Sequence, residues 1–117
     1  LACALNRETR GIVDRKFLEK MKPESVLINI GRGGLILEDD LLSALERGNG
    51  INTAILDVFD IEPLPKNHLF WSHPKVRVTS HNASFGDGMA DRADELFLYN
   101  LECYLAGQPL RKEISNE

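Results

Sequence analysis

Blocks of apolar residues alternate with polar blocks along the chain, and their lengths predict strands that alternate with helices. Residues 25–30 form an almost continuous apolar run with β-branched members, which is typical of a parallel strand covered on both faces. Residues 53–59 predict a second strand of this kind, and residues 75–79 predict a short third one. The pattern therefore predicts three full strands in one mostly parallel sheet.

Three other segments carry helical signals, and we expect helices over residues 15–21, 38–47 and 87–107. Asp14 can cap the first helix, and Pro23 ends it because proline disfavours helical geometry in the preceding residue. The second opens on acidic residues, which suit the positive end of the helix dipole, and a leucine stripe follows them. In the third, apolar residues recur at steps of three and four.

The segments between these elements are expected to be turns and loops. Gly31–Gly34 forms a turn after the first strand, and residues 60–74 are punctuated by prolines, so we expect no regular structure there. The chain opens with the apolar run Leu1–Leu5 and without an initiator Met. This opening indicates the tail of a buried strand and a chain that is part of a longer protein.

The alternation of strands and helices indicates an α/β fold in which β-α-β units build the parallel sheet. At 117 residues and 43% hydrophobic, the chain is long enough for one globular core and too short for two independent domains. Ligands of such sheets bind at the carboxyl ends of the strands. The residues that follow each strand are therefore the candidates for chemistry.

Composition argues against several kinds of partner. The 14 basic and 18 acidic residues give a net charge of −4 and are mixed along the chain, so we expect no surface for nucleic acid. No apolar run approaches the roughly 18 to 20 residues of a membrane span, so no membrane association is expected. Cys3 and Cys103 have no CxxC pair or histidine cluster nearby, so we expect no disulfide scaffold, no metal site and a reducing, cytoplasmic location.

Polar side chains follow each of the three predicted strands. They are Arg32 after the first, Asp57 and Glu62 after the second, and His81 after the third. Taken singly, an arginine between glycines, a glutamate before proline and a histidine after a strand are more often solvated or structural than functional. Together they offer a guanidinium that can bind a carboxylate through two parallel hydrogen bonds, and a histidine that a glutamate can orient as a general acid–base group.

At these strand ends the sequence resembles the family of D-2-hydroxyacid dehydrogenases. Residues 27–34, LINIGRGG, with the acidic and leucine residues that follow, are similar to the family signature vlINxaRGgvvdedaL. Residues 56–65, LDVFDIEPLP, are similar to lDVFexEPlp, and residues 78–81, VTSH, are similar to vtPHia. The order and spacing of the motifs agree as well, and LNRETRG over residues 5–11 resembles the LtpeTrgli stretch that precedes them.

The resemblance implies a role for each of the three main side chains. Arg32 would bind the substrate carboxylate, His81 would pass the proton to or from the 2-keto or 2-hydroxyl oxygen, and Glu62 would hold and polarise His81. NAD or NADP is the implied cofactor, with hydride transfer at the nicotinamide, and no metal is implied. The implied cofactor-binding residues are Ala4, Leu5, Ile30, Gly31, Arg32, Asp57 and His81.

Four residues depart from the family pattern without removing a catalytic side chain. Ser80 and Asn82 replace the proline and the small apolar residue that usually flank the histidine. Ala4 replaces a proline, and Leu37 lies where an aspartate usually caps the next helix. The departures therefore concern how His81 is held and how that helix begins.

The resemblance also implies a partial Rossmann-type doubly wound parallel sheet followed by a long C-terminal helix. Residues 1–86 would be the C-terminal half of the NAD(P)-binding domain, and residues 87–117 the long helix and tail that return to the substrate domain. The Gly-x-Gly-x-x-Gly phosphate loop and the substrate domain are expected upstream of Leu1, so the chain alone is not expected to be active. We expect a homodimer or an association with the rest of the parent chain.

The leading functional hypothesis is an oxidoreductase for a small 2-keto or 2-hydroxy acid, and EPLP with FWSHP at residues 70–74 favours a glyoxylate or hydroxypyruvate reductase. The alternative is a corepressor-like binding protein of the same fold that senses dinucleotides without catalysis. A third hypothesis is a stand-alone signalling receiver domain. That class requires clustered acidic residues near the start of the chain, and this sequence lacks them.

Overall fold

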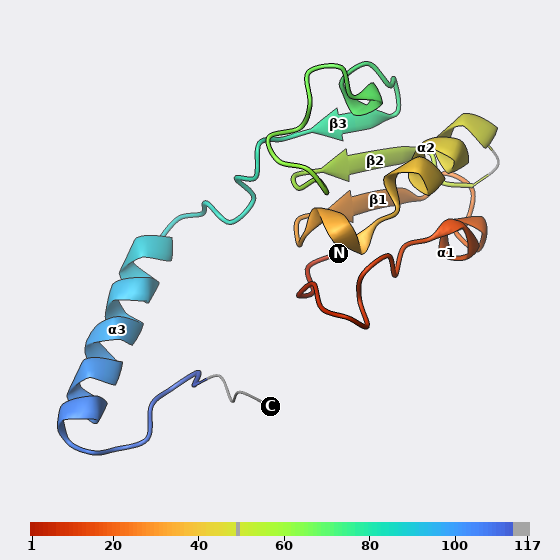
Figure 1. Cartoon of the computed structure of the whole chain (residues 1–117). Helices are drawn as coiled ribbons and strands as arrows, with labels where there is room; N and C mark the ends of the chain where they lie inside the picture. Colours follow the sequence, from red (N-terminus) through yellow and green to blue (C-terminus); the bar gives the residue numbers. More distant parts are fainter. Residues whose placement is uncertain (49, 114–117) are drawn as a thin grey trace. The chain divides into compact units, whose positions relative to one another are not determined.

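The structure is a computed structural model that describes residues 1–48 and 50–113. Its contacts divide the chain into two compact units, Leu1–Ser84 and Phe85–Glu117. Figure 1 shows that the first unit contains the sheet with helices α1 and α2, and that the second contains the long helix α3. The candidate chemistry lies in the first unit.

The sheet consists of strands β1 (Val26–Asn29), β2 (Thr53–Leu56) and β3 (Val76–Val78), paired in the order β1-β2-β3 and all parallel. Asn29 lies beside Leu56, and Leu56 lies beside Val78, so the three carboxyl ends meet at one edge. The predicted strands are confirmed, although each is shorter than its apolar run. The polar residues that follow them are therefore brought to a common edge.

Helices α1 (Arg15–Glu19) and α2 (Glu38–Arg47) confirm the two helices predicted in this unit. The Asp14 carboxylate accepts a hydrogen bond from the Phe17 N–H at 2.8 Å, so the predicted cap is present, although α1 ends two residues earlier than predicted. The N-cap residue of α2 is Leu37, whose side chain accepts no hydrogen bond from the helix. The acidic first turn of α2 must therefore supply the favourable charge at this end.

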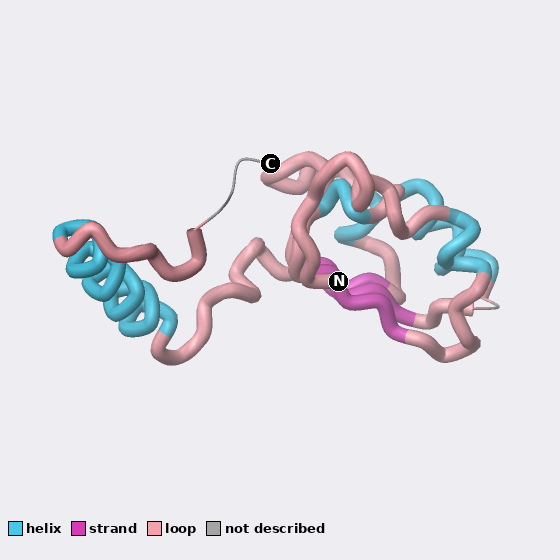
Figure 2. Tube along the Cα trace, turned by 90° about the horizontal axis from the view of Figure 1, so that it is seen from below, coloured by secondary structure: helices cyan, strands magenta, loops and turns pink. Residues whose placement is uncertain are grey.

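The two helices cover one face of the sheet within Leu1–Ser84, as the turned view in Figure 2 shows. Leu27 of β1 and Leu41 of α2 belong to the same buried core. On the other face Val26 and Ile28 are 50% and 47% exposed. The expectation that the first strand is covered on both faces is therefore wrong for this unit, because α1 and α2 lie on the same side.

The opening segment Leu1–Leu5 is not the buried strand tail that the sequence predicted. Only Leu1 pairs with the sheet, through backbone hydrogen bonds to Ile28 and Ile30, and the three residues after it are exposed. The run leads directly into a turn at Asn6, whose side chain accepts hydrogen bonds from the N–H groups of Glu8 and Thr9. The apolar pattern alone therefore predicted a buried strand where the structure has an exposed segment that is not a strand.

The prediction that residues 60–74 lack regular structure is also wrong, because they include the 3-10 helix η2 (Leu69–Trp71). The Nδ1 atom of His68 accepts a hydrogen bond from the Phe70 N–H at 3.2 Å and so caps the first turn of η2. This cap stabilises a short helix inside the loop, and the positions of the prolines alone do not reveal it.

The turn after β1 tightens into the 3-10 helix η1 (Gly33–Leu35), and Gly33 lies against the chain that follows β2. A Cβ atom at Gly33 would lie 1.8 Å from the backbone carbon of Phe59 and 2.0 Å from its oxygen. These are backbone atoms that cannot rotate away, so no side chain fits at this position. The close approach places Arg32 beside the loop that carries Glu62.

We expect Gly33→Ala to lower the free energy of unfolding by about 1–3 kcal/mol, the usual cost of overpacking. Gly50→Ala is the matched control, because a Cβ there would meet its nearest atoms at 3.6 and 3.7 Å, an ordinary contact. Urea unfolding followed by circular dichroism measures both variants. Equal stability of the two would contradict the close packing of Gly33 against Phe59.

The unit Phe85–Glu117 is built around α3 (Met89–Leu105), which confirms the predicted long helix. The Asn100 side chain accepts a hydrogen bond from the Arg111 N–H at 2.9 Å, and the Arg111 guanidinium lies 3.8 Å from the centre of the Tyr99 ring. The segment after α3 therefore folds back onto it. No residue of α3 is buried, and its return to a substrate domain stays a prediction.

Candidate active site at the carboxyl edge of the sheet

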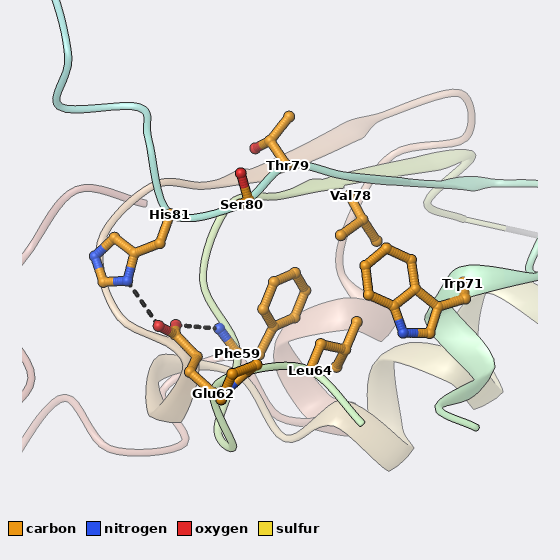
Figure 3. A pocket seen from close by; sticks show the side chains of 9 residues that line it. Phe59, Glu62, Leu64, Trp71, Val78, Thr79, Ser80 and His81 are labelled. Carbon is orange, nitrogen blue, oxygen red and sulfur yellow. Dashed lines mark hydrogen bonds and ion pairs between the residues drawn. The ribbon is translucent and has the colours of Figure 1, made fainter. Parts of the chain in front are cut away.

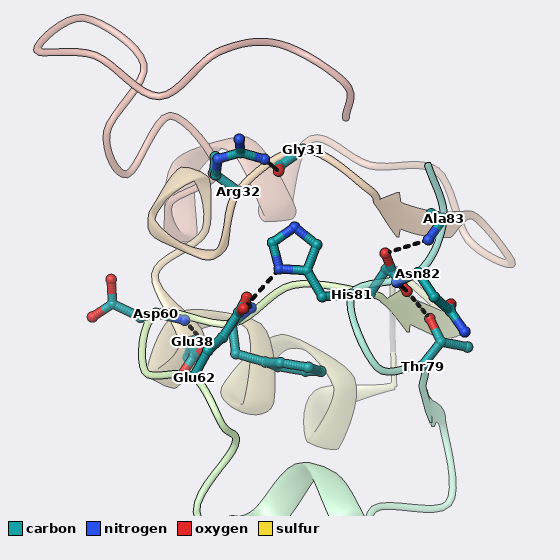
Figure 4. Close-up of polar contacts among 11 residues, drawn as sticks. Gly31, Arg32, Glu38, Asp60, Glu62, Thr79, His81, Asn82 and Ala83 are labelled. Atoms are coloured by element: carbon teal, nitrogen blue, oxygen red, sulfur yellow. Dashed lines mark hydrogen bonds and ion pairs between the residues drawn. The ribbon is translucent and has the colours of Figure 1, made fainter. Parts of the chain in front are cut away.

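The carboxyl edge of the sheet gathers the polar residues that follow the strands. Arg32 follows β1 and His81 follows β3 (Figure 4). Asp57 follows β2 directly. Glu62 reaches the same edge from the loop between β2 and β3. Figure 4 shows the His81 ring between Arg32 and Glu62. The structure thus brings together the three side chains that the sequence singled out for catalysis.

A buried asparagine shapes the turn that carries Arg32. Asn29 is fully buried at the end of β1, where its amide donates to the Arg32 carbonyl at 2.9 Å and accepts from the Gly31 N–H at 3.1 Å. The Arg32 guanidinium donates to the Gly31 carbonyl at 2.8 Å. Arg32 is exposed, and a guanidinium has five N–H donors, so it retains donors for a planar anion such as a carboxylate.

Glu62 and His81 form the predicted carboxylate–imidazole pair. The Nδ1 atom of His81 lies 2.7 Å from Oε2 of Glu62, and Oε1 accepts a hydrogen bond from the Phe59 N–H at 2.9 Å. The hydrogen bond to His81, and then that from Phe59, lowers the pKa of Glu62, and the Arg32 charge acts in the same direction. An ionised Glu62 keeps the proton of a neutral imidazole on Nδ1, which leaves Nε2 free as an acceptor. Figure 4 shows this second nitrogen turned away from Glu62.

Asp57 is 2% exposed and holds the turn that presents His81. Its carboxylate accepts hydrogen bonds from the Thr79 hydroxyl, from the Asn82 N–H at 3.1 Å and from the Ala83 N–H at 2.8 Å. Burial alone would raise the pKa of Asp57, but these three hydrogen bonds outweigh it, so the pKa is lowered. The His81 N–H also donates to the Asp57 carbonyl at 2.8 Å, with His81 in the left-handed region at φ 53°. Asp57 therefore fixes the backbone of His81.

We expect Asp57→Asn to lower the free energy of unfolding near neutral pH by roughly 1–3 kcal/mol, because the new amide donor faces N–H groups that need an acceptor. The folded pKa of Asp57 lies below its ordinary value of 3.8, so its contribution is present above that pH and is lost as the pH falls through the folded pKa. The variant and the parent should therefore converge in acid.

Denaturant unfolding at neutral pH and at about pH 2–3 checks this expectation, with the exposed Asp39→Asn of the α2 first turn as the control. The ionised Asp57 would have no stabilising role if Asp57→Asn and the parent differed in free energy of unfolding by the same amount at both pH values.

The remaining predicted cofactor residues lie around the Arg32 turn. Ile30 is half exposed just after β1, and a Cβ on Gly31 would lie 3.0 Å from the Cys3 carbonyl oxygen. Ala4 is exposed in this opening segment, while Leu5 packs against the core. The opening segment therefore runs beside Gly31. The contacts of these residues with a cofactor stay a prediction.

An apolar pocket of about 550 Å³ lies beside the Glu62–His81 pair (Figure 3). Its lining comes from the loop between β2 and β3 and from the end of β3, and consists of Phe59, Glu62, Pro63, Leu64, Trp71, Val78, Thr79, Ser80 and His81. Arg32 does not line it. A charged ligand therefore matches the Arg32 side of His81 better than it matches this pocket.

Sequence reasoning missed the residues that hold the site from beneath. Asn29 interrupts an apolar run, and this lone polar side chain was the available signal for its role at the Arg32 turn. Thr79 gave no such signal, because threonine is common in strands and only the fold places its hydroxyl against Asp57.

The described ranges 1–48 and 50–113 contain no group of three or more His, Cys, Asp or Glu residues placed to hold a metal ion. No helix within those ranges is long and apolar enough to cross a membrane.

Residues 1–83 match the family model described as D-isomer specific 2-hydroxyacid dehydrogenase, NAD binding domain. The chain belongs to this family. The matched region contains the whole sheet together with Arg32, Glu62 and His81. The family membership that the motifs indicated is therefore confirmed.

Individual family members agree with this assignment. Glyoxylate/hydroxypyruvate reductase A of Serratia proteamaculans (strain 568) is 48% identical over 77 residues, which are 66% of this chain and 24% of the relative. The solved NADPH-dependent glyoxylate/hydroxypyruvate reductase of Sinorhizobium meliloti, in complex with NADP and sulfate, is 32% identical with a TM-score of 0.87 over 97% of this chain and 37% of that one. A D-isomer specific 2-hydroxyacid dehydrogenase from Xanthobacter autotrophicus Py2, in complex with NADPH and MES, is 32% identical with a TM-score of 0.86 over 97% of this chain and 46% of that one.

These likenesses confirm the predicted partial Rossmann-type parallel sheet. The chain spans between 24% and 46% of the length of these three family members.

Proposed function

We propose that this chain is the nicotinamide-side part of an NAD(P)-dependent oxidoreductase that interconverts small 2-keto acids and 2-hydroxy acids. The observation that carries the proposal is the His81–Glu62 pair, whose Nδ1 and Oε2 atoms are 2.7 Å apart, beside the exposed Arg32. An acid–base pair next to a guanidinium fits a substrate that has a carboxylate adjacent to the reacting oxygen.

Each of the three side chains has one task in this proposal. Arg32 binds the substrate carboxylate through two parallel hydrogen bonds and so fixes the position of the carbonyl carbon. In reduction, protonated His81 donates from Nε2 to the carbonyl oxygen as negative charge develops there, and in oxidation the neutral Nε2 accepts the hydroxyl proton. Glu62 holds Nδ1 and stabilises the positively charged ring, as its lowered pKa keeps it ionised.

NAD or NADP is the proposed cofactor, and its nicotinamide, when bound, supplies or accepts the hydride. The half-exposed Ile30 beside Gly31 fits a flat, largely apolar ring. The resemblance predicted a contact between Asp57 and the nicotinamide. The 2% exposure of Asp57 and its three hydrogen-bond donors support a different task, which is to hold the turn that presents His81.

Glyoxylate and hydroxypyruvate are the proposed substrates. The relatives from Serratia and Sinorhizobium carry these names, and the EPLP and FWSHP segments point the same way. The half-exposed Val26 and Ile28 on the uncovered sheet face support association with a second copy or with the rest of the parent chain. The two cysteines, Cys3 and Cys103, are both free, which supports a cytoplasmic location.

The test is an assay of the full-length protein with glyoxylate, hydroxypyruvate and longer 2-keto acids, each with NADH and with NADPH. Oxidation of the reduced nicotinamide, followed by its absorbance, is the expected result. If no acid causes oxidation above background while dinucleotide changes the oligomeric state, the corepressor-like alternative is correct and the catalytic proposal is wrong.

A further inference from the structure

We propose that Glu38, together with His68, is a positioning residue that holds Glu62 against His81. The inference rests on the proposed acid–base role of the Glu62–His81 pair. Glu38 is the first residue of α2, and its carboxylate reaches the loop between β2 and β3, from which Glu62 projects. Figure 4 shows the Glu38 carboxylate bonded to the backbone N–H of Asp60.

The Glu38 carboxylate binds this loop at two points. Its Oε1 accepts a hydrogen bond from the Asp60 N–H at 3.1 Å, and its Oε2 lies 3.4 Å from Nε2 of His68. The side chains of Glu38 and His68 are 21% and 22% exposed, whereas those of Glu62 and His81 are 34% and 47% exposed. The site loop thus contains a second carboxylate–imidazole pair, and this one is the better buried of the two.

The hydrogen bond that the His68 ring accepts fixes the tautomer of its neutral form. Its Nδ1 accepts from the Phe70 N–H at 3.2 Å, so the proton of a neutral ring must be on Nε2, the nitrogen that lies 3.4 Å from Oε2 of Glu38. The His68 ring also packs on the Phe70 ring, with centroids 4.5 Å apart. Phe70 is a fully buried core residue, so His68 is anchored to the core. Glu38 therefore links the loop before Glu62 to an anchored point after it.

This link matters because both side chains of the proposed acid–base pair are partly exposed. Besides contacting His81, the Glu62 carboxylate accepts a hydrogen bond from the Phe59 N–H, and Phe59 directly precedes Asp60 in the chain. If Asp60 moves, the backbone that carries both Phe59 and Glu62 moves with it. Glu38 thus acts on the distance between Glu62 and His81 through the backbone of this loop.

Glu38→Gln tests this role, because an amide offers one acceptor oxygen where the carboxylate offers two. The amide nitrogen must then face either the Asp60 N–H or the His68 Nε2–H, so one contact is lost. The readout is the ratio of Nδ1–H to Nε2–H tautomer of His81, measured by imidazole ¹⁵N NMR at a pH at which the ring is neutral. We expect this ratio to fall by about fivefold, the equilibrium effect of one lost hydrogen bond. Glu62→Gln is the positive control.

Asp39→Asn is the matched control, since it removes one negative charge from the same helix turn at an exposed position. His68→Phe is the second variant, because it keeps a ring against Phe70 while it removes the contact to Glu38, together with the acceptor for the Phe70 N–H. It carries the test if Glu38→Gln does not fold. The proposal predicts a lower ratio in Glu38→Gln and His68→Phe and an unchanged ratio in Asp39→Asn.

An unchanged His81 ratio in the folded variants overturns the proposal, even if Asp60 amide exchange accelerates, because Glu38 would then only support the loop. An equal fall in Asp39→Asn also overturns it, since the cause would be helix charge. A parent chain without the Nδ1–H tautomer overturns both this role and the Glu62–His81 pairing. The NMR measurement needs no catalytic turnover. Failure of this proposal can therefore be told apart from failure of the keto-acid assay.

Discussion

His81→Asn is expected to lower kcat of the full-length enzyme by about 10² to 10⁴-fold, the usual contribution of a general acid–base group. Asparagine is a better test than alanine, because His81 has a left-handed backbone with φ 53°, a conformation that asparagine tolerates. Its amide can still contact Glu62, so the loop is not left without a partner, but it cannot transfer a proton at neutral pH. The loss should therefore report chemistry rather than misfolding.

Cofactor affinity is the measurement that separates these two causes. The dissociation constant for the reduced nucleotide, taken from its fluorescence, should stay near that of the parent. His73→Asn is the matched control, because the Nδ1 atom of His73 only accepts the Lys75 N–H at 3.2 Å, and the asparagine oxygen can replace it. Turnover of His81→Asn within a few-fold of that of His73→Asn would show that the proton comes from another group.

The elements of this chain were predictable because each carries its own local pattern. Helix α2 has an acidic first turn and a leucine stripe, and its bounds match the prediction. The strands follow short apolar runs, and a parallel sheet necessarily brings their carboxyl ends together, so Arg32 and His81 were expected at one edge. Glu62 was placed by family resemblance, because nothing in a proline-rich loop fixes the direction of one carboxylate.

The features that were not predictable depend on contacts between distant segments. The Gly33 turn accommodates no Cβ because the Phe59 backbone lies against it, and sequence spacing does not reveal such an approach. The contact of Asp57 with a cofactor stays a prediction, and its three hydrogen-bond donors come from residues 79, 82 and 83, which only the fold places within reach. Glu38 was assigned to the helix dipole, and its contact with Asp60 became visible only with the loop in place.

Arg32→Lys is expected to lower kcat/KM for a 2-keto acid by about 10² to 10³-fold, within the range found when one partner of a hydrogen-bonded charge pair is removed. A lysine keeps the positive charge but has a single ammonium group, so it cannot reproduce the two parallel hydrogen bonds of a guanidinium to a carboxylate. It also loses the donor that binds the Gly31 carbonyl at 2.8 Å and sets the direction of the side chain. Both KM and kcat should therefore be affected, because the misplaced carboxylate also misplaces the carbonyl carbon.

The amide of the same 2-keto acid makes the Arg32 test specific, because it has no carboxylate for the guanidinium to bind. The parent should discriminate strongly against this amide, while Arg32→Lys should discriminate far less, so the ratio of kcat/KM for acid and amide should collapse in the variant. Arg77→Lys is the matched control, since the Arg77 guanidinium donates to the carbonyls of Pro74 and Val76 at the edge strand β3. If Arg32→Lys lowers kcat/KM equally for the acid and the amide, Arg32 does not bind the carboxylate. Its task would then be electrostatic, since its charge already lowers the pKa of Glu62 beside His81.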